Sequence, residues 1–161
     1  MQVYLLRHGI AEDGRPGRPD ADRALTDEGR LRLRAVLERA RAAGAAPTLI
    51  LSSPYLRAAQ TARIAAEVLG CPAPPLLSDS FVPEASPVDA WEEIRDYDEE
   101  PAVLVASHEP LMSSAAAYLL GCPALDIDVK KAALLRIDMT RLGAQPRGIL
   151  KWMLTPALCK E

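Results

Sequence analysis

"MQVYLLRHG", residues 1–9, opens with a short apolar run that holds β-branched and aromatic side chains and stops abruptly at Arg7 and His8. Such a run is typical of a buried strand. The chain has only two histidines, and one of them stands directly at the end of this strand. Gly9 follows and allows the backbone to turn tightly beneath the imidazole ring. The strand end is therefore a candidate functional position.

Apolar runs and helical patterns alternate along the rest of the chain. We expect strands at 1–7, 47–53, 101–107, 130–139 and 148–156, helices at 25–44, 54–70, 88–100 and 110–121, a loop at 12–24, and irregular structure at 71–87 with one short strand near Leu76 and Leu77. Strands that alternate with helices imply a largely parallel sheet covered on both faces. The predicted fold class is α/β, with three α/β/α layers.

Length and composition limit the function classes. At 161 residues, 49% of them apolar, the chain can bury one core, so we expect a single domain over residues 1–161. A net charge of −3 argues against a general nucleic-acid or anionic-membrane surface. No run of about eighteen apolar residues and no basic leader is present, so we expect a cytoplasmic protein. The widely spaced Cys71, Cys122 and Cys159 predict reduced thiols and no zinc site.

Unusual polar residues follow three of the expected strands. Arg7 and His8 end the first strand, Ser53 ends the second and is followed one helical turn later by Arg57, and His108 follows the strand at 101–107. In open α/β sheets ligands bind at the carboxyl ends of the strands. We therefore expect these five side chains to share one pocket.

The residue types in this pocket suit a phosphoryl group. Arg7 and Arg57 carry forked, permanently charged donors that match phosphate oxygens, and Ser53 precedes a helix whose free N–H groups also favour an anion. His8 can attack phosphorus with one ring nitrogen while a backbone carbonyl in the Gly9 turn holds the other. The sequence therefore predicts a nucleophilic His8 and a phosphate-binding role for Gly9 and Ser53.

Each residue also has an ordinary structural interpretation. Arg57 taken alone is typical of a solvated helix arginine, and His108 taken alone is typical of a hydrogen-bonded histidine at a strand end. The tripeptide Arg-His-Gly is a weak motif by itself. The functional interpretation is favoured because Arg57, His108 and the Arg-His-Gly tripeptide are all expected at the same edge of the sheet.

Five motifs carry a resemblance to a known family. They are "LLRHG" at 5–9, "LTDEG" at 25–29, "SSPYLRAAQTA" at 52–62, "SHEP" at 107–110, and the tail "WMLTP" at 152–156, which resembles the form W-x-M-x-P. Together they resemble the histidine phosphatase superfamily, which is also called phosphoglycerate-mutase-like. The short chain and the tail look most like its small SixA-type branch, whose members are phosphohistidine phosphatases acting on phosphotransfer proteins.

The resemblance implies roles by position. His8 would be phosphorylated transiently, Arg7 and Arg57 would hold the phosphoryl oxygens, and a charged His108 would be the second histidine. No metal and no cofactor is implied. Relatives carry a general acid in the segment corresponding to 78–86, where Asp79 and Glu84 compete and Glu84 is preferred.

Glu109, beside His108, has two possible roles. Its carboxylate could keep His108 cationic, or it could cap the first turn of the next helix, which is the preferred interpretation.

The expected function is hydrolysis of phosphohistidine on phosphotransfer proteins through a covalent phosphohistidine on His8. Short connections after the first two strands predict a weakly covered pocket that could admit a phosphorylated side chain of another protein. The alternatives are a non-catalytic phosphate-binding module and a broad small-molecule phosphomonoesterase. A mutase is disfavoured because nothing resembles a lid. We expect a monomer that binds neither nucleic acid nor membrane.

Overall fold

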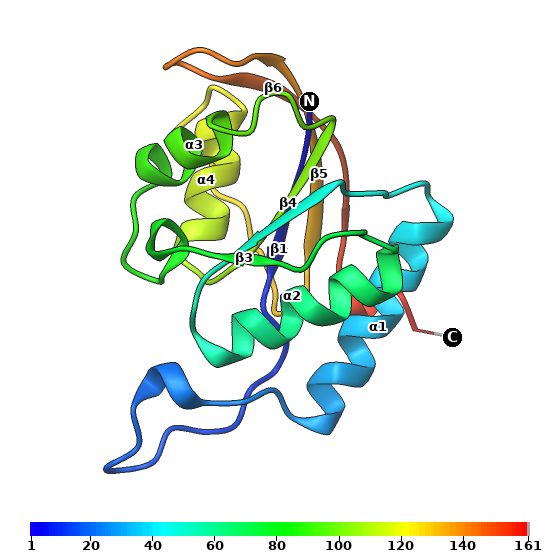
Figure 1. Ribbon diagram of the computed structural model, residues 1–161, viewed down its shortest axis with the longest axis vertical. Coiled ribbons are helices and arrows are strands. Elements are labelled where there is room, and N and C mark those ends of the chain that lie inside the picture. Colours follow the sequence, from blue (N-terminus) through cyan, green and yellow to red (C-terminus); the bar gives the residue numbers. More distant parts are fainter. Residues whose placement is uncertain (161) are drawn as a thin grey trace.

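The computed structural model describes residues 1–160, and within them one mixed sheet of six strands forms the centre of the molecule in the order β3-β2-β4-β1-β5-β6 (Figure 1). The strands are β1 (Gln2–Arg7), β2 (Leu49–Ser52), β3 (Leu76–Leu77), β4 (Ala102–Ser107), β5 (Leu134–Arg141) and β6 (Arg147–Leu154). β1 to β4 pair in parallel, as predicted.

Helices cover both faces of this sheet, so the predicted three-layer arrangement is confirmed (Figure 1). They are α1 (Asp27–Ala42), α2 (Leu56–Leu69), α3 (Pro87–Arg95) and α4 (Leu111–Leu119). Successive side chains of a strand point to opposite faces. Leu6 and Leu104 accordingly pack with α1 and α2, whereas Leu5 and Val105 pack with α3 and α4.

The last two strands run antiparallel to their neighbours. Only residues 142–146 separate β5 from β6, and a parallel connection needs a crossover of about a dozen residues or more, so these strands can pair only as a hairpin. Figure 1 shows this hairpin at the edge of the sheet beyond β1. The sheet is therefore largely parallel, with an antiparallel edge.

All four helices are shorter than the sequence predicts. The helix expected at 88–100 ends at Arg95, because the acidic residues that follow would lie against the negative end of the helix dipole. The helix expected from residue 54 begins at Leu56, after an extended Tyr55. No helix among residues 1–160 is long and apolar enough to span a membrane.

A backbone bridge joins the two ends of the connection from β1 to α1. Ala11 and Leu25 form an isolated antiparallel bridge, and the Thr26 side chain caps α1 by accepting from the Gly29 backbone N–H at 2.9 Å. The helix start lies so close to this connection that a Cβ on Gly29 would run into the Ile10 carbonyl oxygen. Gly29 therefore allows α1 to pack directly beneath the segment that follows His8.

Replacing Gly29 by alanine tests this close approach. Because backbone stands in the way of the new methyl group, we expect Gly29→Ala to lower the free energy of unfolding by about 1–3 kcal/mol, measured by urea denaturation. Gly14→Ala is the matched control, since its Cβ would meet nothing within 4 Å. Equal stability of the two variants would contradict the packing described here.

Candidate active site

The sheet register brings the predicted site residues together. Arg7 pairs with Ser107 across β1 and β4, and the His8 backbone N–H donates to the Ser107 carbonyl at 2.9 Å. On the other side of β4, the Ser53 N–H donates to the Ala106 carbonyl at 3.0 Å. The carboxyl ends of β1, β2 and β4 therefore meet at one edge, as the sequence predicts.

His8 is held in one orientation with one ring nitrogen free. Its Nδ1 lies 2.7 Å from the Gly9 carbonyl oxygen, which can only accept, so Nδ1 carries the proton. Nε2 then has a lone pair, and the Arg57 Nε–H points to it at 3.4 Å. Burial, followed by the cationic Arg57 and Arg7, lowers the pKa of His8 to about 4 despite the Gly9 hydrogen bond. A neutral imidazole at neutral pH is the form that can act as a nucleophile.

His108 lies beside His8, with 5.0 Å between the ring centroids. Its Nε2 is 2.8 Å from the Ser53 hydroxyl oxygen, and its buried Nδ1 has no hydrogen-bond partner among residues 1–160. Burial, with His8 and Arg57 adding to it, lowers the pKa of His108 to about 3. Removing this ring from water disfavours its cationic form, so the charged His108 that the resemblance implies stays a prediction for the state with a phosphoryl group in the pocket.

Arg57 and Arg7 reach the same place from opposite sides. Arg57, in the first turn of α2, is 4% exposed, which excludes the solvated-helix interpretation. Arg7 donates from Nη1 to the Val129 carbonyl at 2.9 Å. Its buried Nε has no hydrogen-bond partner in the part of the chain that is described, which leaves a donor for a ligand.

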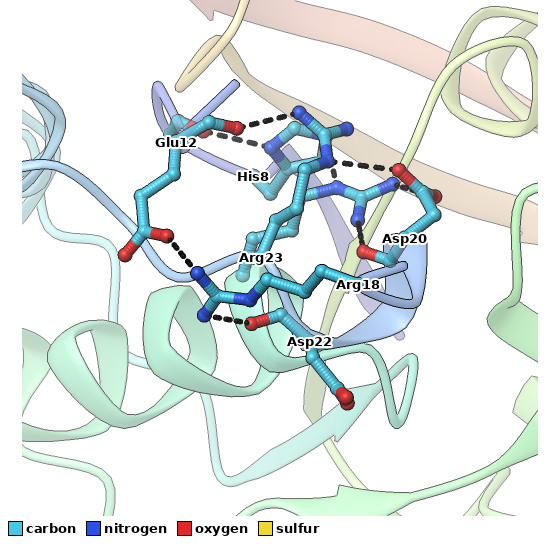
Figure 2. A network of polar contacts seen from close by, with 8 residues as sticks. His8, Glu12, Arg18, Asp20, Asp22 and Arg23 are labelled. Carbon is cyan, nitrogen blue, oxygen red and sulfur yellow. Dashed lines mark hydrogen bonds and ion pairs between the residues drawn. The ribbon is translucent and has the colours of Figure 1, made fainter. Parts of the chain in front are cut away.

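The connection after β1 adds charged residues that sequence reasoning missed. Asp20, in a 3-10 turn, accepts from Arg57 through its backbone oxygen at 2.8 Å and through its carboxylate at 3.1 Å. Arg23 donates to the other Asp20 carboxylate oxygen at 2.8 Å (Figure 2). The expectation of short connections after the first two strands is wrong for β1, which residues 8–26 separate from α1, and is confirmed for β2, which only residues 53–55 separate from α2. Ala11, Asp20 and Arg23 of the longer connection line the pocket.

A cavity of about 240 Å³ opens in front of the two histidines. It is lined by Arg7, His8, Ala11, Asp20, Arg23, Arg57, Pro83, Glu84, His108, Glu109 and Lys131. Glu84 is thus at the pocket, whereas Asp79 is not among its lining residues. Gly9 and Ser53 lie behind the histidines rather than on the cavity wall: the Gly9 N–H donates to the Thr61 hydroxyl at 3.2 Å, and Ser53 contacts His108.

Glu109, on the rim of the pocket, caps the helix that follows it. Its carboxylate accepts from the Ser113 backbone N–H at 2.6 Å, so the predicted capping of α4 is confirmed.

Within residues 1–160 no three His, Cys, Asp or Glu side chains are grouped to hold a metal ion. The acceptors and donors at this pocket are instead arranged around His8.

The comparisons with known proteins agree with this geometry. The family model for the histidine phosphatase superfamily (branch 1) matches residues 3–79. An uncharacterized protein of a Picosynechococcus species is 32% identical over 165 residues, which cover 96% of this chain and 99% of that protein. The chain belongs to the histidine phosphatase superfamily. In this histidine phosphatase the matched range holds Arg7, His8 and Arg57.

Solved structures of related phosphatases share its fold. The protein histidine phosphatase SixA complexed with tungstate is 24% identical, covers 99% of this chain and 100% of its own, and gives a TM-score of 0.88. An Agrobacterium tumefaciens protein that carries the name SixA is 26% identical, with 96% and 97% coverage and a TM-score of 0.83. The α-ribazole phosphatase of Shigella flexneri is 18% identical over all of both chains, with a TM-score of 0.71. The predicted phosphoglycerate-mutase-like fold is confirmed.

The low histidine pKa values of this histidine phosphatase predict a pH-dependent stability. Imidazoles of an unfolded chain titrate near 6.5, whereas His8 and His108 titrate at about 4 and about 3 in the folded state. Between these values the unfolded chain binds more protons, so the stabilising contribution is complete above pH ~6.5 and is lost as the pH falls towards ~4.

The check is urea denaturation at several pH values in this window. The double variant His8→Gln/His108→Gln should lose less stability than the wild type between neutral pH and pH ~4.5. Parallel pH curves for the two proteins would show that the histidines are not buried in neutral form.

Proposed function

We propose that this protein is a phosphohistidine phosphatase, which hydrolyses phosphohistidine on phosphotransfer proteins through a covalent phosphohistidine on His8. The observation that carries the proposal is the His8 ring, whose Nδ1–H donates to the Gly9 carbonyl while the unprotonated Nε2 lies 3.4 Å from Arg57 Nε. A fixed tautomer, an unprotonated ring nitrogen and an adjacent cation favour nucleophilic attack on a phosphoryl group.

In the first step the lone pair of His8 Nε2 bonds to phosphorus. The bond between phosphorus and the imidazole nitrogen of the substrate breaks, and its electron pair leaves with that imidazole, which takes a proton from Glu84. The Gly9 carbonyl stabilises the positive charge that develops on the His8 ring through Nδ1–H. Glu84 is exposed at the cavity, where it can exchange protons with water between steps.

In the second step water removes the phosphoryl group from His8. The water oxygen bonds to phosphorus, the bond from phosphorus to Nε2 breaks with its electron pair returning to Nε2, and the water proton passes to the Glu84 carboxylate. Inorganic phosphate then leaves, and both side chains are restored.

Arg7, Arg57 and His108 stabilise the charge of the transferred group in both steps. Its transition state spreads negative charge over the equatorial oxygens, so preplaced donors are the main help that a protein can give. Each well-placed donor contributes about 100- to 1000-fold in rate. The phosphoryl anion also opposes the effect of burial on His108, since a nearby negative charge favours the protonated ring.

Two observations support a protein substrate. A second cavity of about 530 Å³ adjoins the first and shares Arg7 and Lys131 with it, so the site continues along the surface beyond the phosphoryl position. SixA, which shares this fold, is a protein histidine phosphatase.

We further propose a cytoplasmic monomer that works without a metal. The free thiols of Cys71, Cys122 and Cys159 fit such a reducing compartment.

Replacing His8 tests the covalent step. Wild type should hydrolyse a chromogenic phosphate ester slowly and retain a phosphoryl label that is labile in acid and stable in alkali. His8→Ala should lose both turnover and label because it removes the nitrogen that attacks phosphorus, with thermal unfolding used to verify that the variant is folded. Turnover equal to wild type would remove His8 as the nucleophile, and phosphate binding without turnover would favour a non-catalytic module.

A competition experiment tests the substrate class. A phosphorylated histidine-phosphotransfer domain, a panel of phosphorylated metabolites and the chromogenic ester are offered together, and phosphate release from each is followed. We expect the phosphohistidine domain to give the highest kcat/KM, because its P–N bond is labile and needs little help from Glu84. A preferred metabolite would instead identify a small-molecule phosphomonoesterase.

A further inference from the structure

Asp20 contacts the arginine that faces the nucleophile. Its backbone oxygen accepts from Arg57 Nη1 at 2.8 Å, and its carboxylate oxygen Oδ2 accepts from Nη2 at 3.1 Å. Both terminal nitrogens of the guanidinium are thus bound by one residue, while the remaining nitrogen, Nε, points to His8 Nε2 at 3.4 Å. Asp20 therefore sets the orientation in which the Arg57 guanidinium faces His8 Nε2.

Arg57 needs such a restraint because its side chain is long and has another attractive neighbour. The guanidinium carbon lies 5.2 Å from the centre of the Tyr55 ring, and an arginine over an aromatic face is stabilised by cation–π attraction. The guanidinium already lies over this ring, but attraction to a ring face does not fix the direction of the individual N–H groups. The two bonds to Asp20 fix that direction.

Asp20 is itself fixed by a network within the β1–α1 connection (Figure 2). Arg23 donates from Nε to Asp20 Oδ1 at 2.8 Å and from Nη1 to the Glu12 carbonyl at 2.8 Å. The Leu25 N–H also donates to Gln60 Oε1 of α2 at 2.8 Å, which ties the connection to the helix that carries Arg57. These contacts give Asp20 a fixed position relative to α2.

The network also limits the electrostatic disadvantage of an anion beside a phosphoryl site. Asp20 lies between two arginines, so the group Arg57, Asp20 and Arg23 retains one net positive charge at the cavity. Hydrogen bonds from Arg57 and Arg23 lower the pKa of Asp20 against the opposing effect of burial, so the carboxylate stays ionised. Each terminal nitrogen of Arg57 still carries a second N–H for a phosphoryl oxygen.

We propose that Asp20 is a positioning residue for phosphoryl transfer, which holds the Arg57 guanidinium with Nε–H directed at the phosphoryl group on His8. This inference deepens the proposed phosphatase function and rests on it. The same contacts could have made Asp20 an internal competitor that a phosphoryl group must displace from Arg57. The two roles predict opposite effects of removing the carboxylate.

The kinetic test compares Asp20→Ala with Asp20→Asn on the chromogenic ester. Asp20→Ala should lower kcat by about 10- to 100-fold, the scale expected when a catalytic group moves by about 1 Å. Asp20→Asn keeps a side-chain oxygen for Nη2 and should retain most of the wild-type kcat. Unchanged or faster turnover of Asp20→Ala would overturn the proposal in favour of a competitor, and equal losses in both variants would overturn it in favour of a role for the charge.

Asp22→Ala is the matched control. Asp22 lies in the same 3-10 turn, and among residues 1–160 its carboxylate has no ion-pair partner, while its backbone oxygen accepts from Arg18. The variant should stay within about twofold of wild type, as surface substitutions usually do. A loss as large as that of Asp20→Ala would mean that any change in this turn disturbs the site, and would overturn the specific role of Asp20.

A spectroscopic measurement tests the same role without catalysis. The Arg57 Nε–H signal in a ¹H–¹⁵N spectrum is assigned by its disappearance in Arg57→Lys. We expect a sharp signal in wild type and Asp20→Asn, and a broadened or shifted one in Asp20→Ala. An unchanged signal in Asp20→Ala would overturn the proposal. An inactive wild type with the expected signals would count against the phosphatase function alone.

Discussion

The parallel pairing of β1 with β4 is the constraint on which the site depends. Arg7 lies opposite Ser107, and a histidine directly follows each of these two residues. The two imidazole rings therefore come to lie 5.0 Å apart. A shift of one residue in this register would turn one imidazole to the other face of the sheet. Both faces of β1 are packed, with Val3 and Leu5 in the layer of α3 and α4 and Leu6 in the layer of α1 and α2, so that shift would exchange side chains between two fitted layers.

Burial then gives the paired histidines their chemical character. Two imidazoles next to two arginines would be poor bases in water, and removing them from water depresses their pKa values further. The result is a neutral imidazole beside permanent positive charge. Such a pocket attracts an anion while His8 stays unprotonated, which separates the binding groups from the group that we propose reacts.

Much of this site could be predicted from the sequence, and the exceptions have physical reasons. His8, Arg57 and His108 were predictable because the carboxyl ends of parallel strands share an edge. Asp20 and Arg23 were not, because a charged stretch with Gly and Pro looks the same whether it is solvated or paired with a buried arginine. The lowered pKa of His108 was also hidden, since it depends on burial and not on residue type. The shorter α3 could have been anticipated from the acidic residues at its end.

The position of β1 at the centre of the sheet has a consequence for biosynthesis. Gln2 pairs with Ala102 on one side and with Asp138 on the other, so the first strand leaves the ribosome about 100 residues before either neighbour exists. At a synthesis rate of about 5–20 residues per second, its apolar side chains wait roughly 5–20 s for a partner. The strand that carries Arg7 is thus made well before the strands that pair with it, and its backbone lacks those hydrogen-bond partners throughout that interval.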